Sequence, residues 1–216
     1  MDGFFIALEW IDGSGKTTLR ESLSLWLQEK TGREVLIGWE PKQEEQGVWA
    51  GAIRKVLRGE LQPPADPLEF QRLYLFDRAE DIYFTIAPRL KDGNILLYDR
   101  YALSTLAYGM LSNISVDRLI TLHDEVIGPA MVWPHLNIIL DLDPAIALSR
   151  KSQQYDKPDL FEKIESLNGI RNAYRVVAEH PRFKASTIVV DANQSSEKID
   201  VEIKRILELR LAGGIL

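Results

Sequence analysis

The run Asp12-Gly13-Ser14-Gly15-Lys16-Thr17 has the residue types and the spacing of a loop that binds nucleotide phosphates. Glycines let backbone N–H groups turn toward phosphate oxygens, and a following helix N-terminus adds partial positive charge. In such a loop the lysine reaches the outer phosphates, and the next hydroxyl can ligate Mg²⁺. We therefore expect an ATP site made of Trp10, Ile11, Asp12, Gly13, Ser14, Gly15, Lys16, Thr17 and Thr18, with Lys16 catalytic and Thr17 a metal ligand.

The segments around this loop have the required pattern. An apolar run over residues 4–8 predicts a buried strand over 4–9, and helical spacing of apolar residues over 16–30 predicts a helix. The full pattern G-x-x-x-x-G-K-[ST] begins with a glycine where this chain has Trp10. Either the indole points away from the phosphates or it weakens nucleotide binding. The alternative to a phosphate site is a chance glycine-rich turn before a helix.

A second group with chemical potential is Asp99-Arg100, which follows an apolar strand at 95–98. An aspartate in this position can hold Mg²⁺ or its waters, as in the second metal motif of phosphate-loop enzymes. An arginine can clamp a phosphate with two hydrogen bonds. The alternative is a plain helix start, with the aspartate as N-cap and the arginine as surface charge.

Tyr74 and Arg78 are four residues apart in a segment with helical pattern, so they share one helix face. A ring and a guanidinium placed in this way could grip one planar base. The alternative is that Tyr74 belongs to the core and that Arg78 pairs with Asp77, Asp81 or another neighbour.

Strands and helices alternate along the whole chain. Strands are predicted at 4–9, 34–39, 95–98, 136–141 and 187–190, and helices at 16–30, 48–58, 66–90 (kinked near Pro88), 102–111, 115–127, from 143, 160–178 and 195–211. This order predicts an α/β fold with a five-stranded parallel sheet covered by helices on both faces, in one domain over 1–216. Ligands of such sheets bind beyond the carboxyl ends of the strands, so residues 10–16, 40–41 and 99–100 should meet in one cleft.

Composition excludes several classes of protein. The chain has 216 residues, no cysteine and a net charge of −6, which argues against disulfides, thiolate metal sites and a surface that coats nucleic acid. The histidines His123, His135 and His180 are scattered, so structural or surface roles are expected. No apolar run is long enough to span a membrane and no signal peptide is evident. We expect a cytoplasmic protein without nucleic-acid or membrane partners.

The run Asp99-Arg100-Tyr101-x-x-Ser104-x-x-Ala107-Tyr108 resembles the DRYxxSxxAY signature of thymidylate kinases. Glu40-Pro41, Tyr74-x-x-x-Arg78 and the stretch from Leu140 through Asp143-Pro144 to Arg150 are similar to further motifs of that family, as is the stretch 190–195. The likeness covers nearly the whole chain in the right order. It implies a P-loop NTPase fold with a short lid at about 150–160.

The resemblance also implies roles for single residues. Asp12 would hold the 3′-hydroxyl region of deoxyribose, Tyr74 would stack on the base, and Arg78 would bond its carbonyl edge. Tyr108 would select deoxyribose, Arg100 would bind the acceptor phosphate, and Arg150 would supply the lid arginine. Glu40, Pro41 and Ser104 complete the substrate residues, and Asp99 joins Thr17 as metal ligand.

Some positions depart from the family pattern. Trp10 replaces a glycine, Trp39 stands where many members have arginine, and residues 42–46 lack the usual Gly-Gly-Thr. Gly109 stands where a polar residue often assists base recognition, and Lys42 or Arg54 could substitute as phosphate contacts.

The sequence therefore predicts a Mg²⁺-dependent nucleoside monophosphate kinase, with ATP and dTMP as substrates and a homodimer as the family assembly. The helices at 66–90 and 102–111 would supply the dimer face. Alternatives are a catalytically weakened ATP-binding regulatory protein of the same fold and a kinase of another deoxynucleoside monophosphate.

Overall fold

The computed structural model describes residues 3–10, 16–151 and 164–213, without the side chains of Trp10, Lys16, Thr17, Arg150 and Lys151. Within these residues the chain forms one five-stranded sheet in the order β2-β3-β1-β4-β5. Its strands are β1 (Phe4–Trp10), β2 (Val35–Trp39), β3 (Ile95–Asp99), β4 (Leu136–Asp141) and β5 (Thr187–Asp191). All four strand pairings are parallel, as the sequence predicted.

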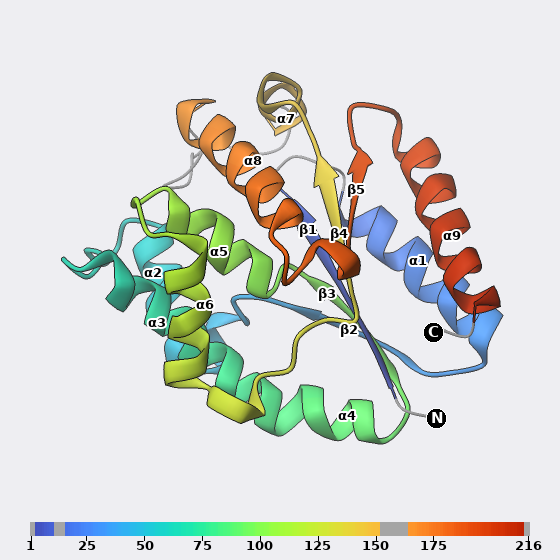
Figure 1. Ribbon diagram of the computed structural model, residues 1–216, viewed down its shortest axis with the longest axis horizontal. Coiled ribbons are helices and arrows are strands. Elements are labelled where there is room, and N and C mark those ends of the chain that lie inside the picture. Colours follow the sequence, from blue (N-terminus) through green and yellow to red (C-terminus); the bar gives the residue numbers. More distant parts are fainter. Residues whose placement is uncertain (1–2, 11–15, 152–163, 214–216) are drawn as a thin grey trace.

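The described helices cover both faces of this sheet (Figure 1). The α-helices are α1 (Lys16–Thr31), α2 (Val48–Leu57), α3 (Pro67–Asp81), α4 (Ala87–Lys91), α5 (Ala102–Met110), α6 (Val116–Val126), α7 (Pro144–Lys151), α8 (Ile164–Glu179) and α9 (Ser196–Ala212). Short helical turns are η1 (Glu44–Gln46), η3 (Gly128–Ala130) and η4 (Lys184–Ser186). Helices α1 and α9 lie together on one side of the sheet, and α4, α5 and α8 lie on the other.

The helix predicted over residues 66–90 is continuous but irregular. Between α3 and α4 lies η2 (Ile82–Ile86), a π-helical turn in which the Ala87 N–H donates to the Ile82 carbonyl. Pro88 has no N–H to donate, and its ring crowds the preceding turn of an α-helix. The wider turn therefore precedes Pro88, and the irregularity spans 82–86 instead of lying at the proline itself.

The core consists of the alternating faces of the buried strands. In β1, Phe4, Ile6 and Leu8 belong to the larger apolar cluster, while Phe5 and Ala7 pack with residues of η2 and of β3. Because both sets are fully or almost fully buried, β1 has the continuous apolar sequence expected of a central parallel strand. This rigid centre positions the residues that follow each strand.

The carboxyl ends of β2, β3 and β1 lie side by side, since these strands are neighbours in the sheet. Trp39 pairs with Asp99 and Leu8 pairs with Asp99 in the parallel register. Glu40, Arg100 and Glu9 therefore all start from one edge of the sheet, where ligands of this fold class bind.

Candidate active site

A small cleft opens at this edge of the sheet. Its walls come from the end of β2, from α2, from α3 and from the turn between β3 and α5. The lining residues are Glu40, Pro41, Leu57, Gln71, Tyr74, Arg100, Tyr101, Ser104, Thr105 and Tyr108. The structure thus brings together the segments Glu40-Pro41, Tyr74 and Arg100 to Tyr108, which are far apart in the sequence.

Arg100 has an unusual backbone conformation, with φ at +64°. Few residues other than glycine adopt this left-handed region, and such strain needs support from its surroundings. The Arg100 N–H donates to the Leu8 carbonyl at 2.8 Å, and the next N–H, of Tyr101, donates to Glu9 Oε1 at 3.1 Å. The Arg100 guanidinium lies over the Tyr108 ring, 5.4 Å from its centroid. Strand β1 therefore holds the turn that carries this arginine into the cleft.

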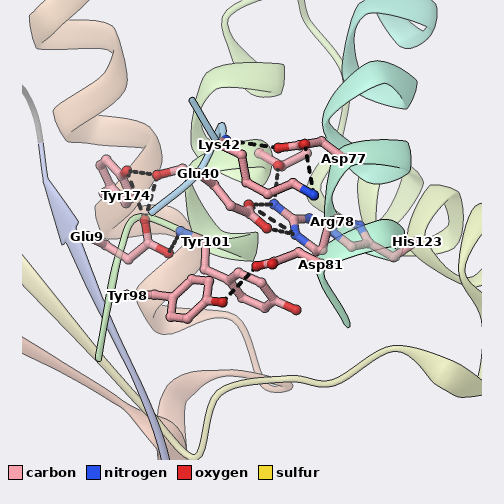
Figure 2. Close-up of polar contacts among 12 residues, drawn as sticks. Glu9, Glu40, Lys42, Asp77, Arg78, Asp81, Tyr98, Tyr101, His123 and Tyr174 are labelled. Carbon is pink, nitrogen blue, oxygen red and sulfur yellow. Dashed lines mark hydrogen bonds and ion pairs between the residues drawn. The ribbon is translucent and has the colours of Figure 1, made fainter. Parts of the chain in front are cut away.

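Glu9 is a buried carboxyl group that the sequence analysis did not single out. It accepts hydrogen bonds from the Tyr101 N–H, from Ser104 Oγ at 2.6 Å and from the Tyr174 hydroxyl at 3.3 Å. Burial raises the pKa of Glu9 to about 7, and its hydrogen bond with Ser104 opposes the rise. Figure 2 shows the resulting cluster, which joins β1, α5 and α8 around one carboxylate. A charged residue directly after the apolar run 4–8 was the available signal.

Arg78 and Glu40 form a buried ion pair at the centre of Figure 2. Arg78 Nε lies 3.0 Å from Glu40 Oε1, and Arg78 NH2 lies 2.5 Å from Glu40 Oε2. Arg78 is fully buried, and a guanidinium cannot lose its proton in a protein. Burial raises the pKa of Glu40, while the charge of Arg78 opposes that rise. Because both carboxylate oxygens accept N–H groups, the geometry fits an ionised Glu40.

The other side of the Arg78 guanidinium contacts two polar side chains. Its NH2 group donates to Thr105 Oγ1 at 2.9 Å, and its NH1 group lies 2.6 Å from His123 Nε2. His123 Nδ1 lies 2.8 Å from the Leu119 carbonyl, so Nδ1 carries the proton and Nε2 accepts from arginine. Burial lowers the pKa of His123 to about 3, which keeps the ring neutral. His123 therefore has a structural role.

The predicted base-binding pair separates into a cleft residue and a buried one. Tyr74 lines the cleft, and its ring meets Phe70 edge to face. Arg78 lies behind the cleft surface, and Thr105 and Glu40, which it contacts, form part of that surface. Its partner is thus neither Asp77 nor Asp81 but a residue from the end of β2.

Asp99 lies at the end of β3, where it was predicted as a metal ligand. Its Oδ2 lies 3.6 Å from an Arg20 nitrogen, and its side chain is 16% exposed. A single accessible carboxylate fits Mg²⁺, which usually takes one or two carboxylates together with substrate phosphates and waters. No group of three or more His, Cys, Asp or Glu side chains that could hold a metal occurs in the described part of the chain.

Much of the predicted ATP site lies outside the described residues. This holds for Ile11, Asp12, Gly13, Ser14 and Gly15, for most of the predicted lid at 150–160, and for the side chains of Trp10, Lys16, Thr17 and Arg150. In the adjoining backbone, β1 ends at Trp10 and α1 starts at Lys16. A strand and a helix therefore flank the loop, as predicted. Thr18 is exposed in the first turn of α1.

Lys42 and Arg54 are both engaged by protein groups, and neither lines the cleft. Lys42 Nζ lies 3.7 Å from Asp77 and 3.8 Å from Glu80. Arg54 donates to the backbone carbonyls of Lys42 and Pro41 at 2.5 and 2.6 Å, so it braces the loop after β2.

Position 109 faces away from the cleft. A Cβ atom added to Gly109 would lie 2.8 Å from two methyl groups of Leu119 on α6. A polar side chain at this position has no room in the present packing.

A second carboxylate–arginine cluster lies at the end of β4. Asp141 accepts from Arg171 Nε at 2.6 Å and from Arg175 NH2 at 2.7 Å, and Arg171 also donates to Asp143 at 3.2 Å. These contacts join the stretch 140–144, which resembles a family motif, to helix α8. The Asp141 side chain is 17% exposed, and the two arginines lower the pKa of its carboxyl against the effect of burial.

Comparison with known proteins identifies relatives over almost the full chain. The family model described as thymidylate kinase matches residues 8–203. A thymidylate kinase of Cereibacter sphaeroides is 35% identical over 204 residues, which are 91% of this chain and 90% of that protein. Probable thymidylate kinases of Archaeoglobus fulgidus and Pyrococcus horikoshii are 34% and 32% identical, and they cover 94% and 99% of this chain and 94% and 100% of their own lengths.

These matches agree with the parallel sheet, with the strand and helix that flank the glycine-rich loop, and with the cleft between α3 and α5. The resemblance first noted in the DRY segment is thus confirmed across the fold. The chain belongs to the thymidylate kinase family.

Proposed function

We propose that this protein transfers the γ-phosphoryl group of ATP to dTMP, giving dTDP and ADP. The observation that carries the proposal is the cleft in which Tyr74, Arg100, Ser104 and Tyr108 meet, in a chain of this family. An aromatic ring, a guanidinium and two hydroxyl-bearing side chains suit a base, a phosphate and a sugar. An oxygen of the acceptor phosphate attacks the γ-phosphorus, and the bond to the bridging oxygen of ADP breaks.

The proposed acceptor site starts from Arg100. Its guanidinium binds the dTMP phosphate, while Tyr74 stacks on the base and Tyr108 lies against the deoxyribose. Support comes from the turn at Arg100, whose conformation is fixed by two hydrogen bonds. The Arg100 N–H donates to the Leu8 carbonyl, and the Tyr101 N–H donates to the Glu9 carboxylate. Phosphoryl transfer depends mainly on alignment and charge neutralisation, so a rigid arginine is a suitable device.

The proposed donor site is the loop between β1 and α1. Residues 10–18 take the ATP phosphates, with Lys16 at the transferred group and Arg150 closing from the lid. When bound, Mg²⁺ supplies charge neutralisation between the phosphates, and Thr17 and Asp99 are the proposed ligands. Asp12 contacts the sugar of the acceptor, and Glu40 with Pro41 forms the wall beside it.

We also propose a cytoplasmic homodimer with ATP and dTMP as its partners. Among the described helices none combines the length and apolar character needed to cross a bilayer. Helix α5 is mostly buried within the subunit, whereas Tyr83 and Phe84 in η2 are 73% and 71% exposed. We therefore place the dimer face at the 82–86 turn. Light scattering should give twice the 24.6 kDa chain mass, and the chain mass itself would contradict the dimer.

A coupled assay for ADP with ATP and a panel of deoxynucleoside monophosphates tests the reaction. We expect the highest kcat/KM with dTMP, and an Arg100→Ala variant should lose about 100-fold or more, since a charge-assisted phosphate contact is removed. A wild-type rate with dTMP no higher than that of Arg100→Ala would overturn the proposal. A higher rate with another monophosphate would reassign the acceptor, and ATP binding without turnover would favour a regulatory protein.

A further inference from the structure

Tyr174 on α8 reaches the turn that carries Arg100, although no motif in the sequence indicated it. Its side chain is almost completely buried, with 2% of the residue exposed. Its hydroxyl lies 2.7 Å from Ser104 Oγ, 70 residues away in the sequence, and 3.3 Å from Glu9 Oε2. One hydroxyl therefore joins α8 to the first turn of α5 and to the end of β1 (Figure 2).

The hydrogen bonds of this cluster run in one direction, toward Glu9. Burial raises the pKa of Tyr174, so its hydroxyl keeps its proton and donates. Ser104 Oγ donates its own proton to Glu9 Oε2 at 2.6 Å, so it accepts the proton of Tyr174. The other carboxylate oxygen, Oε1, accepts the Tyr101 N–H at 3.1 Å. Both oxygens of Glu9 are thus held, one through α8 and one by the backbone beside Arg100.

The cluster ends at a strained point of the chain. Arg100 has φ at +64°, and the N–H group that Glu9 holds belongs to the next residue. Such a conformation in a residue other than glycine persists only where its surroundings fix it. Burial raises the pKa of Glu9, and the charge of Arg100 is among the effects that oppose this rise, so the two side chains also interact electrostatically. A loosened carboxylate should therefore release the Arg100 guanidinium from its place over Tyr108.

We propose that Glu9 and Tyr174 are positioning residues whose hydrogen bonds fix the orientation in which Arg100 meets the acceptor phosphate. This inference rests on the proposed function, because it concerns the phosphate contact of Arg100. Neither Glu9 nor Tyr174 lines the cleft, so both act through another residue. The alternative is that the cluster only packs α8 against α5, and the two roles predict different ligand dependence.

Tyr174→Phe tests the inference, because phenylalanine keeps the buried ring and removes only the hydroxyl. Calorimetry on the full chain would compare dTMP with thymidine, which has the same base and sugar but no phosphate. We expect the variant to bind dTMP about 10-fold more weakly, since the charge-assisted contact with the phosphate loses its alignment. Thymidine binding should change less than about twofold. Equal losses for both ligands, or no loss for dTMP, would overturn the inference.

A double-variant cycle asks whether the hydroxyl acts through Arg100. In an Arg100→Ala background the phosphate contact is already absent, so adding Tyr174→Phe should change dTMP binding less than about twofold. A 10-fold loss in this background would show that the hydroxyl acts by another route, contrary to the inference.

Tyr98→Phe is the matched control. The Tyr98 hydroxyl is also buried and also donates to a carboxylate, that of Asp81 at 2.7 Å, but this pair is separate from the bonds that lead to Arg100. Both variants lose one buried hydrogen bond, so both should have lower melting temperatures than the wild type. Only Tyr174→Phe should change the ratio of dTMP to thymidine affinity. The same change of ratio in both variants would reduce Tyr174 to a packing role.

Two substitutions of Glu9 provide a test of rescue. Glutamine keeps an acceptor for the Tyr101 N–H and an amide N–H for Ser104 Oγ, whereas leucine removes both contacts. Glu9→Gln should therefore bind dTMP more tightly than Glu9→Leu, and equal losses would contradict positioning by these hydrogen bonds. A failure of the proposed function looks different. In that case the wild type itself would not phosphorylate dTMP, and Arg100→Ala would leave dTMP binding unchanged.

Discussion

Two carboxylate–arginine clusters occupy the carboxyl ends of parallel strands, and they differ mainly in their contact with water. Glu40 and Arg78, at the end of β2, are almost completely shielded, with side chains 4% and 0% exposed. Asp141 and Arg171, at the end of β4, are 17% and 18% exposed, and Arg175 beside them is 52% exposed. The pairs have similar distances but different surroundings.

This difference teaches that geometry alone does not determine what an ion pair does. Removing one partner of a shielded pair is strongly destabilising, because it leaves a single buried charge. Such a pair contributes more to a defined local structure than to the stability of the fold. A hydrated pair can lose one partner to water at little cost. We infer that the β2 cluster fixes the shape of the acceptor cleft, and that the β4 cluster tethers α8 in a way that tolerates change.

The largest effect is expected from Arg78→Met. The variant leaves Glu40 buried without its cation, so the free energy of unfolding should fall by about 3–5 kcal/mol. Denaturant unfolding at pH 7 measures this. Arg72→Met, on the same helix but paired with the exposed Glu69, is the matched control and should change stability by less than about 1 kcal/mol.

The double variant Glu40→Leu with Arg78→Met sharpens this result. Removing both charges should restore part of the loss, because neither partner is left alone. A double variant less stable than Arg78→Met alone would mean that Glu40 stabilises the fold without the arginine, contrary to the comparison.

A smaller, pH-dependent effect is expected from Glu9→Gln. Burial raises the pKa of Glu9 in the folded protein to about 7, from the ordinary glutamate value of 4.5. The folded state then binds the proton more tightly, so the stability from this group is complete below pH 4.5 and is lost as the pH rises to about 7. Glutamine does not titrate. Between pH 4.5 and about 7, the free energy of unfolding of the variant should therefore rise relative to that of the wild type, by at most about 3 kcal/mol.

Thermal unfolding at several pH values measures the Glu9 effect. Glu29→Gln, at an exposed position of α1, is the control. The difference in stability between this variant and the wild type should not show the pH dependence expected for Glu9→Gln. A constant difference between Glu9→Gln and the wild type from pH 4.5 to 8 would contradict a raised pKa.

Substitutions in the partly exposed cluster at the end of β4 should change the free energy of unfolding only slightly. Arg171→Met should lower the free energy of unfolding by about 1 kcal/mol, because water partly replaces the guanidinium at Asp141. Arg175→Met should have the smallest effect, below about 0.5 kcal/mol, since Arg175 is largely solvated. A loss at Arg171 as large as that at Arg78 would end the distinction between the clusters.

Salt offers an independent comparison of the same two clusters. At about 1 M ionic strength the screening length falls to about 3 Å, which weakens exposed charge pairs but leaves shielded ones almost unchanged. The effect of Arg171→Met should therefore shrink in salt, while that of Arg78→Met persists.

The fold could be predicted almost entirely from the sequence, because buried parallel strands are continuous apolar runs. The five predicted strands match the observed ones within one or two residues, and the glycine-rich loop lies between strand and helix as expected. The π-turn at 82–86 could not be predicted, since apolar spacing does not distinguish i→i−4 from i→i−5 bonding. Pro88 indicated only that some irregularity was near.

The candidate site was predictable where motifs are local. Tyr74, Arg100, Ser104 and Tyr108 were found from spacing and resemblance, and they share one cleft. The partner of Arg78 could not be derived, because Glu40 lies 38 residues away and only the tertiary fold unites them. Tyr174 and Glu9 were missed because a lone polar residue carries no periodic signal, and its burial is known only from the packed structure.

The left-handed turn at Arg100 has a consequence for how the two substrates are aligned. The same segment of β1 that anchors this turn, through Leu8 and Glu9, continues after Trp10 into the loop proposed for ATP. If the proposed sites are right, this short stretch of backbone sets the distance between the ATP loop and Arg100. Other residues of the cleft can change, and with them the base that is bound, while the distance between this loop and Arg100 stays the same. Base selectivity and the alignment of the two substrates can therefore change independently in this architecture.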